Sequence, residues 1–177
     1  MRTNRIGMAA AAVALLAMSA PAVADQYDDR VAAEEVTPPT RADKAAELRQ
    51  QAEALFSQPK KWKQAVRLLE ESAALRDAND PEGYACLLYA GRIRAAIGDT
   101  EGARTVLEKA AAQALARGSV VEAATAYIDA AHAAVAMKDV RGARELVAKA
   151  ALLTESPLLS VQDRSFLQAR ISTWRAV

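Results

Sequence analysis

Residue types that commonly carry chemistry are scarce in this 177-residue chain. It holds one histidine, His132, and one cysteine, Cys86. Protein zinc sites usually combine several His and Cys ligands, so a centre of that kind is not expected. No glycine-rich phosphate loop is present. Carboxylates such as Glu70, Glu71 and Glu122 are numerous, but they fall on predicted helix surfaces, where charged residues usually form a solvated face. The sequence therefore predicts a protein that is not an enzyme, with no catalytic residues, metal or cofactor.

The first 24 residues are typical of a secretory signal peptide. Arg2 and Arg5 stand at the start of a short apolar run over residues 6–18, and Ala22-Val23-Ala24 forms a small-x-small cleavage site. The apolar run is shorter than the roughly 20 residues that a membrane-spanning helix needs. We predict cleavage after Ala24, export to the periplasm or the medium, and no stable membrane anchor after processing.

Charge in the remaining chain is balanced, with 21 basic and 22 acidic residues once Arg2 and Arg5 are removed. This balance argues against nucleic acid as a partner, because such proteins concentrate basic residues on one face. Residues 25–40 are acidic and end in two prolines before Thr40. A segment of this composition buries too little to fold alone. It is predicted to be a disordered linker, with an acidic binding arm as the alternative.

The single cysteine permits no internal disulfide. Because free cysteine is among the most buried residue types, Cys86 is interpreted as a small core residue. A reactive thiol, or one that bridges two chains, is the other interpretation.

The composition favours helices over sheets, since alanine supplies 44 residues and aromatics only 5%. Helix starts and stops are legible throughout residues 40–157. They are a Thr40/Asp43 capping box, Asp80-Pro81, Gly98-Asp99, a Ser119/Glu122 capping box, Lys138-Asp139 and Ser156-Pro157. They predict antiparallel helix hairpins at about 41–77, 81–117 and 119–153, followed by a helix at 157–174. In that last helix, Leu159, Phe166 and Trp174 are expected to face inward.

An internal repeat runs through the three hairpins. Small and apolar residues recur with the same spacing of 12, 4 and 3 residues, and the repeat steps are 38 and 40 residues. The three sets are Glu53, Ala65, Leu69, Ser72; Gly91, Ala103, Leu107, Ala110; and Ala131, Ala143, Val147, Ala150. The first set is the weakest match, because Glu53 stands where the other two have a small residue. Small residues allow two antiparallel helices to approach closely, and the apolar residue one turn on fills the same seam. Hairpins of this kind stack to share a core.

At these residues the chain resembles the tetratricopeptide repeat (TPR) family over about residues 41–155. The second hairpin is most similar, and it carries Leu87, Ala90, Gly91, Gly98, Asp99, Ala103, Leu107 and Ala110. The repeat is longer than the usual 34 residues of that family, and its closing proline is displaced to Pro81 and Pro157. The resemblance implies an all-α fold for residues 41–177, a right-handed α-solenoid of three TPR-like antiparallel hairpins with a C-terminal capping helix.

The resemblance also implies a concave groove, lined by the first helix of each hairpin, that holds a peptide or a partner helix. The residues expected to face it are Glu47, Gln50, Ala54, Leu88, Arg92, Ala95, Thr125, Ile128 and His132. Arg92 and His132 occupy equivalent positions in adjacent hairpins. They would present two donors to a carboxylate or a backbone carbonyl.

These features together predict a protein–protein interaction scaffold of the bacterial cell envelope, with an unidentified protein or peptide as its partner. A helical carrier of a lipid or another apolar ligand is the alternative, and it requires a cavity of about 300 Å³ or more. Weak self-association, through the exposed surface of an end hairpin or through Cys86, is a third possibility.

Overall fold

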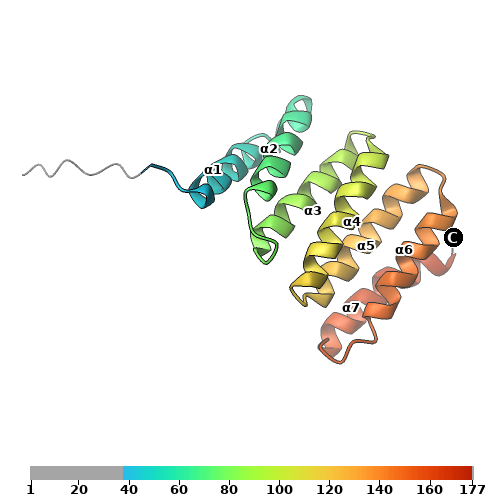
Figure 1. Cartoon of the computed structure of the whole chain (residues 1–177). Coiled ribbons are helices and arrows are strands. Elements are labelled where there is room, and N and C mark those ends of the chain that lie inside the picture. Colours follow the sequence, from blue (N-terminus) through green and yellow to red (C-terminus); the bar gives the residue numbers. More distant parts are fainter. Residues whose placement is uncertain (1–37, 177) are drawn as a thin grey trace, which may run out of the picture. The chain divides into compact units, whose positions relative to one another are not determined.

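A computed structural model describes residues 38–176 of the chain (Figure 1). These residues form α-helices and two short 3-10 turns, with no strand among them, so the all-α prediction is confirmed for this part of the chain. The predicted signal peptide, its cleavage after Ala24 and residues 25–37 of the predicted linker lie outside the described residues. The helices are α1 (Arg41–Glu53), α2 (Trp62–Ala74), α3 (Pro81–Ala96), α4 (Thr100–Ala116), α5 (Val120–Ala136), α6 (Val140–Leu153) and α7 (Val161–Ser172).

From α1 to α6, the most extensive contacts are those between helices that are consecutive in the chain. Figure 1 shows these neighbours side by side, joined by short turns that reverse the direction of the chain. The last helix, α7, contacts both α5 and α6. Within residues 38–176, no helix combines the length and the hydrophobicity needed to cross a membrane.

Most of the predicted helix starts agree with the structure. Thr40 and Asp43 form a reciprocal capping box at α1, and the Asp80 carboxylate accepts the amide of Glu82 at the start of α3. Gly98 has a positive φ of 85°, which a residue without a Cβ adopts at low cost, so α3 ends there. Residues with short polar side chains thus satisfy the amides that helix starts leave without partners.

Helix α5 begins after Ser119, as predicted, but Ser119 makes no side-chain capping bond there. The Glu122 carboxylate pairs with the guanidinium of Arg117, so the predicted capping box does not form. A charged partner offers a stronger hydrogen bond than a backbone amide. The last helix begins at Val161 rather than near Pro157, because Ser160 accepts the amide of Asp163 at 3.0 Å and caps the helix at that point.

The small residues of the internal repeat lie in the helix seams. Ala65, Ala103 and Ala143 are buried, with at most 2% of their surface exposed. A Cβ on Gly91 would lie 2.5 Å from Cγ of Leu107, so α3 and α4 approach too closely for any larger residue. The third hairpin differs from the prediction at one position. There Leu146 fills the seam, while Val147 is only half-buried.

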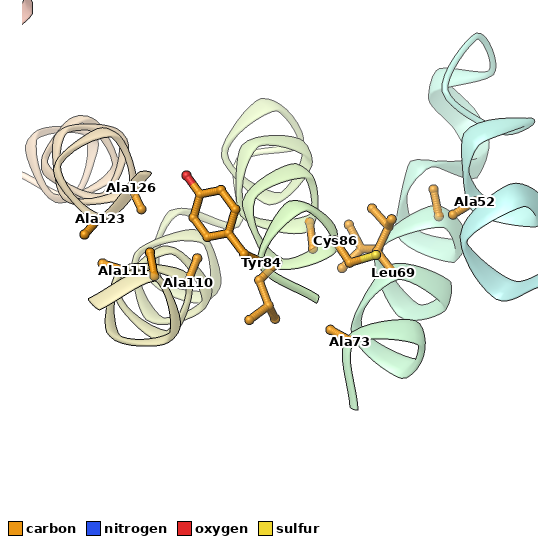
Figure 2. Packing of buried hydrophobic residues seen from close by; sticks show 14 residues of the cluster. Ala52, Leu69, Ala73, Tyr84, Cys86, Ala110, Ala111, Ala123 and Ala126 are labelled. Carbon is orange, nitrogen blue, oxygen red and sulfur yellow. The ribbon is translucent and has the colours of Figure 1, made fainter. Parts of the chain in front are cut away.

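The core is built mainly from alanine, with few large side chains. Figure 2 shows Tyr84 reaching from α3 toward Ala123 and Ala126 of α5. Its hydroxyl donates to the carbonyl of Glu122 at 3.0 Å, and burial raises the pKa of the Tyr84 phenol. Cys86 is fully buried against Leu69, and its Sγ lies 3.5 Å from the hydroxyl of Ser72. The core interpretation of Cys86 is confirmed, and a disulfide between chains would require these helices to separate.

Asp99 and Asp139 each cap a second helix and also pair with an arginine of an earlier helix, Arg94 of α3 and Arg104 of α4. Asp99 accepts the amide of Gly102 and pairs with Arg94. The equivalent carboxylate of Asp139 accepts the amide of Gly142 at 2.8 Å and pairs with Arg104 at 2.6 Å. The bond from Arg94 and the Gly102 amide hold the pKa of Asp99 below its ordinary value of 3.8. The pKa of Asp139 is also lowered, by the hydrogen bonds from the Gly142 amide and from Arg104.

These two carboxylates predict a loss of stability in acid. A carboxyl group with a lowered pKa in the folded state stabilises the fold above its unfolded pKa, and this contribution disappears as the pH falls through the folded pKa. The melting temperature of the parent is therefore expected to fall below about pH 4 more steeply than that of Asp99→Asn/Asp139→Asn. Circular dichroism melts across this pH range measure the difference. Asp77→Asn, in a turn without such bonds, is the control, and equal slopes for parent and double variant would contradict the account.

Candidate binding face on the first helices

A row of aromatic and charged side chains connects the first helix of each hairpin with α7. Phe56, in the turn after α1, contacts Tyr89 of α3 with ring centroids 5.9 Å apart. Arg92 of α3 pairs with Asp129 of α5, which also pairs with Arg170 of α7. We call this surface the first-helix face, defined by Phe56, Trp62, Tyr89, Arg92, Ile93, Asp129, Phe166 and Arg170.

Asp129 organises the charged part of the first-helix face. Its Oδ2 accepts both Nε and Nη2 of Arg92 at 2.7 Å, and its Oδ1 accepts Nη2 of Arg170 at 2.6 Å. The Asp129 side chain is 11% exposed, whereas that of Arg92 is 46% exposed. Two guanidinium groups on one carboxylate leave a net positive charge. Arg92 has five N–H donors and keeps some of them for a ligand on its exposed side.

An apolar pocket adjoins Arg92 on the same face. It has a volume of about 200 Å³ and is lined by Phe56, Trp62, Tyr89, Arg92, Ile93 and Ala96. The indole Nε1 of Trp62 donates to the carbonyl of Phe56 at 2.9 Å, which holds two walls of the pocket together. The 3-10 turn Pro59–Lys61 precedes Trp62 and brings it back beside Phe56. The pocket thus presents aromatic surface beside an exposed cation.

The residues predicted to line the groove have different surroundings. Glu47 and Gln50 of α1 are exposed, as are Ala54 and Ala95. Leu88 and Thr125 are half-buried. Ile128 is fully buried, because Leu167 and Ile171 of α7 pack in the same cluster, so the prediction that it faces a groove is wrong.

The use of Arg92 and His132 as two donors stays a prediction, because both residues are exposed but have different neighbours. His132 lies against Trp174, with ring centroids 4.6 Å apart, and partial burial lowers its pKa against the opposing effect of Asp129. The cation that joins Arg92 is Arg170, because both bind Asp129. Of the three residues predicted to face inward in the last helix, Leu159 is buried and Trp174 is half-buried, as expected. Phe166 is instead 52% exposed beside Arg170, and Leu167 and Ile171 are the buried residues of α7.

Of the eight residues that define the first-helix face, only Arg92 was predicted to face the groove. Tyr89 and Asp129 each precede a predicted donor by three residues, so helical spacing alone places them on the same face as Arg92 and His132. The sequence spacing could therefore have identified Tyr89 and Asp129. It could not have identified Arg170, because the position of Arg170 depends on where α7 packs.

The described residues contain no group of three or more His, Cys, Asp or Glu side chains that would hold a metal ion. No protein-family model matches the chain, and no curated protein matches it either. The function is therefore inferred from the geometry of the first-helix face.

Proposed function

We propose that this protein is a non-catalytic interaction scaffold that binds a peptide segment of another protein on its first-helix face. The observation that carries this proposal is the open aromatic pocket of about 200 Å³ with Arg92 at its rim. Peptide-binding surfaces commonly combine an apolar anchor pocket with a few polar groups that fix the orientation of the ligand.

The chemistry of the pocket specifies the ligand. The pocket is smaller than the roughly 300 Å³ of a typical small-molecule site, so it suits one large apolar or aromatic side chain. A carboxylate near that side chain would accept a charge-assisted hydrogen bond from Arg92, the strongest kind available on this surface. Asp129 fixes the direction of the guanidinium and prevents it from folding over the pocket. The preferred ligand is an acidic peptide with an aromatic or aliphatic anchor.

The helix arrangement supports a TPR-like α-solenoid as the scaffold. Helices pack in chain order, small residues lie in successive seams, and the repeat steps are 38 and 40 residues. In such a solenoid, α7 is the capping helix. It covers Ile128 on α5 and leaves open the pocket between α3 and the turn that follows α1. The proposed binding region therefore lies mainly on the first two hairpins, whereas the predicted groove extended over all three.

Export to the bacterial periplasm or the medium is part of the same proposal. It rests on the basic residues, the short apolar run and the Ala22-Val23-Ala24 site of the first 24 residues. The carrier alternative gains little support from the described residues. Two apolar pockets on them measure about 260 and 200 Å³, below the roughly 300 Å³ expected for a carrier. A pocket of about 500 Å³ between α6 and α7 is lined mostly by polar side chains, which do not suit an apolar ligand.

Selection of peptides from a random display library tests the proposal. The protein, expressed from the full chain and purified, is expected to enrich sequences with an acidic residue near a large apolar one. Tyr89→Ala removes a pocket wall and Arg92→Ala removes the donor. Each change is expected to weaken a selected peptide by about tenfold in titration calorimetry, the loss typical of one good contact.

Matched controls separate the site from general stability. Leu115 on α4 is exposed to the same extent as Tyr89, 41%, and Leu115→Ala is expected to bind like the parent. Arg141→Ala is the matched control for Arg92→Ala, because Arg141 on α6 is a cation with a 92% exposed side chain. This control is also expected to bind like the parent. Selected peptides without an acidic residue, or equal affinities for all variants, would contradict the proposed ligand.

A further inference from the structure

A second surface runs along the seam between α6 and α7. Its apolar part has a volume of about 260 Å³ and is lined mainly by Val135, Val140, Val147, Ala151, Ile171 and Trp174. Its polar part, of about 500 Å³, includes Glu155, Arg164 and Gln168. Ala151 and Ile171 line both parts, so the two form one continuous groove along α6. We call it the α6 groove.

The outer side of α6 carries a stripe of residues along this groove. The stripe consists of Val140, Arg144, Val147, Ala148 and Ala151, whose spacing of three and four places them on one side of α6, and of Glu155, which lies in the turn after the helix ends at Leu153. Val140 is 45% exposed, so its apolar surface is available to a partner. Among residues 38–174, no carboxylate pairs with Arg144 and no cation pairs with Glu155. Val147 and Ala151 are half-buried because they pack against the cluster that contains Leu167 and Ile171 of α7, whereas Val140, Arg144 and Ala148 are exposed.

The order of residues in the stripe is self-complementary. Arg144 and Glu155 lie at equal distances from the midpoint between Ala148 and Ala151. A two-fold axis through this midpoint sets a second copy of α6 antiparallel to the first and brings Arg144 of each copy opposite Glu155 of the other. The two alanines then face each other at the centre, where small side chains permit close approach of the helices.

We propose that the protein forms a homodimer through the α6 groove, with two-fold symmetry about the centre of α6. The interface contains two equivalent Arg144–Glu155 ion pairs at its ends, Ala148 and Ala151 at its centre, and apolar surface from Val140 and Val147. An isologous contact of this kind closes on itself and leads to a dimer rather than a filament. A helix from an unrelated protein would need an acid at one end and a base at the other, both of which a second copy supplies by symmetry.

Charge reversal tests the dimer and its register together. Sedimentation equilibrium of the protein expressed from the full chain is expected to show a monomer–dimer equilibrium. Arg144→Glu and Glu155→Arg each replace two attractive contacts by two repulsive ones. Each is expected to weaken dimerisation by about tenfold, given two surface ion pairs. The double variant Arg144→Glu/Glu155→Arg exchanges the charges and is expected to return to near the parent dissociation constant.

The matched control is Arg141→Glu, a reversal on the same helix at a residue that does not line the groove. It is expected to leave the dimer constant nearly unchanged. Recovery in the double variant supports the proposed register. A protein that stays monomeric at every concentration, or a dimer unaffected by the single reversals, would overturn the proposal. The result does not bear on the first-helix face, because neither reversed residue belongs to it.

Discussion

Replacing Leu107 with alanine is expected to lower the free energy of unfolding by about 3 kcal/mol, within the range measured for buried leucines. Leu107 is 1% exposed and lies at the seam where α4 meets Gly91 of α3. It also belongs to the cluster that includes Ala130 and Ala131 of α5. Because one side chain fills the contact between successive hairpins, its removal leaves a cavity that rigid alanine neighbours cannot close. Urea unfolding followed by circular dichroism measures the loss.

The reverse change tests the same contact. Gly91→Ala places a methyl group against the Leu107 side chain and is expected to cost about 1–3 kcal/mol by overpacking. In Gly91→Ala/Leu107→Ala, the new methyl enters the vacated space, so the combined loss is expected to be smaller than the sum. Leu115→Ala is the control on the same helix, since Leu115 is 41% exposed. Strict additivity of the two changes, or a loss for Leu115→Ala equal to that for Leu107→Ala, would show that the seam is placed wrongly.

Replacing Asp129 with alanine is expected to cost about 2 kcal/mol, between the values for exposed and fully buried ion pairs. The change leaves Arg92 and Arg170 beside each other without the carboxylate that holds both. It also removes a contact that joins α3, α5 and α7. Chemical unfolding measures the stability, and proteolysis near residues 161–172 reports whether α7 has loosened.

An exposed ion pair provides the control for Asp129→Ala, and a second substitution tests whether its effect can be compensated. Glu145→Ala breaks the Arg141–Glu145 pair, whose side chains are 92% and 61% exposed, and is expected to cost less than about 0.5 kcal/mol. Adding Arg170→Gln to Asp129→Ala removes one of the two repelling cations and is expected to restore part of the loss. If Asp129→Ala is as mild as Glu145→Ala, Asp129 does not hold these helices together.

Much of the fold could be predicted because its determinants are local or periodic. The Thr40/Asp43 capping box and the Asp80 cap act within one helical turn. The repeat spacing placed Gly91 opposite Leu107 without any structure. The errors have a different cause. The Ser119/Glu122 capping box does not form, and the Glu122 carboxylate pairs with Arg117, which lies over the Tyr84 ring at 5.4 Å. That ion pair depends on tertiary contacts.

The candidate site was less predictable for the same reason. Arg92 was identified from its register and is exposed on the first-helix face, as expected. The position of α7 was not encoded in the repeat, and it determines that Ile128 is covered and that Arg170 joins Asp129. The aromatic pocket depends on the turn between α1 and α2, where Phe56 and Trp62 come together through one backbone hydrogen bond. Irregular turns of this kind leave no periodic signal.

Site-specific photocrosslinking in cells that express the full chain tests the central claim most directly. A photoreactive amino acid is placed at Tyr89 on the first-helix face or at Leu115 on α4, two positions with the same exposure of 41%. The account predicts a discrete adduct with a partner protein from position 89 that is lost when Arg92→Ala is added, and none from position 115. Adducts of equal yield at both positions, or an adduct from position 115 alone, would contradict the assignment of the binding face.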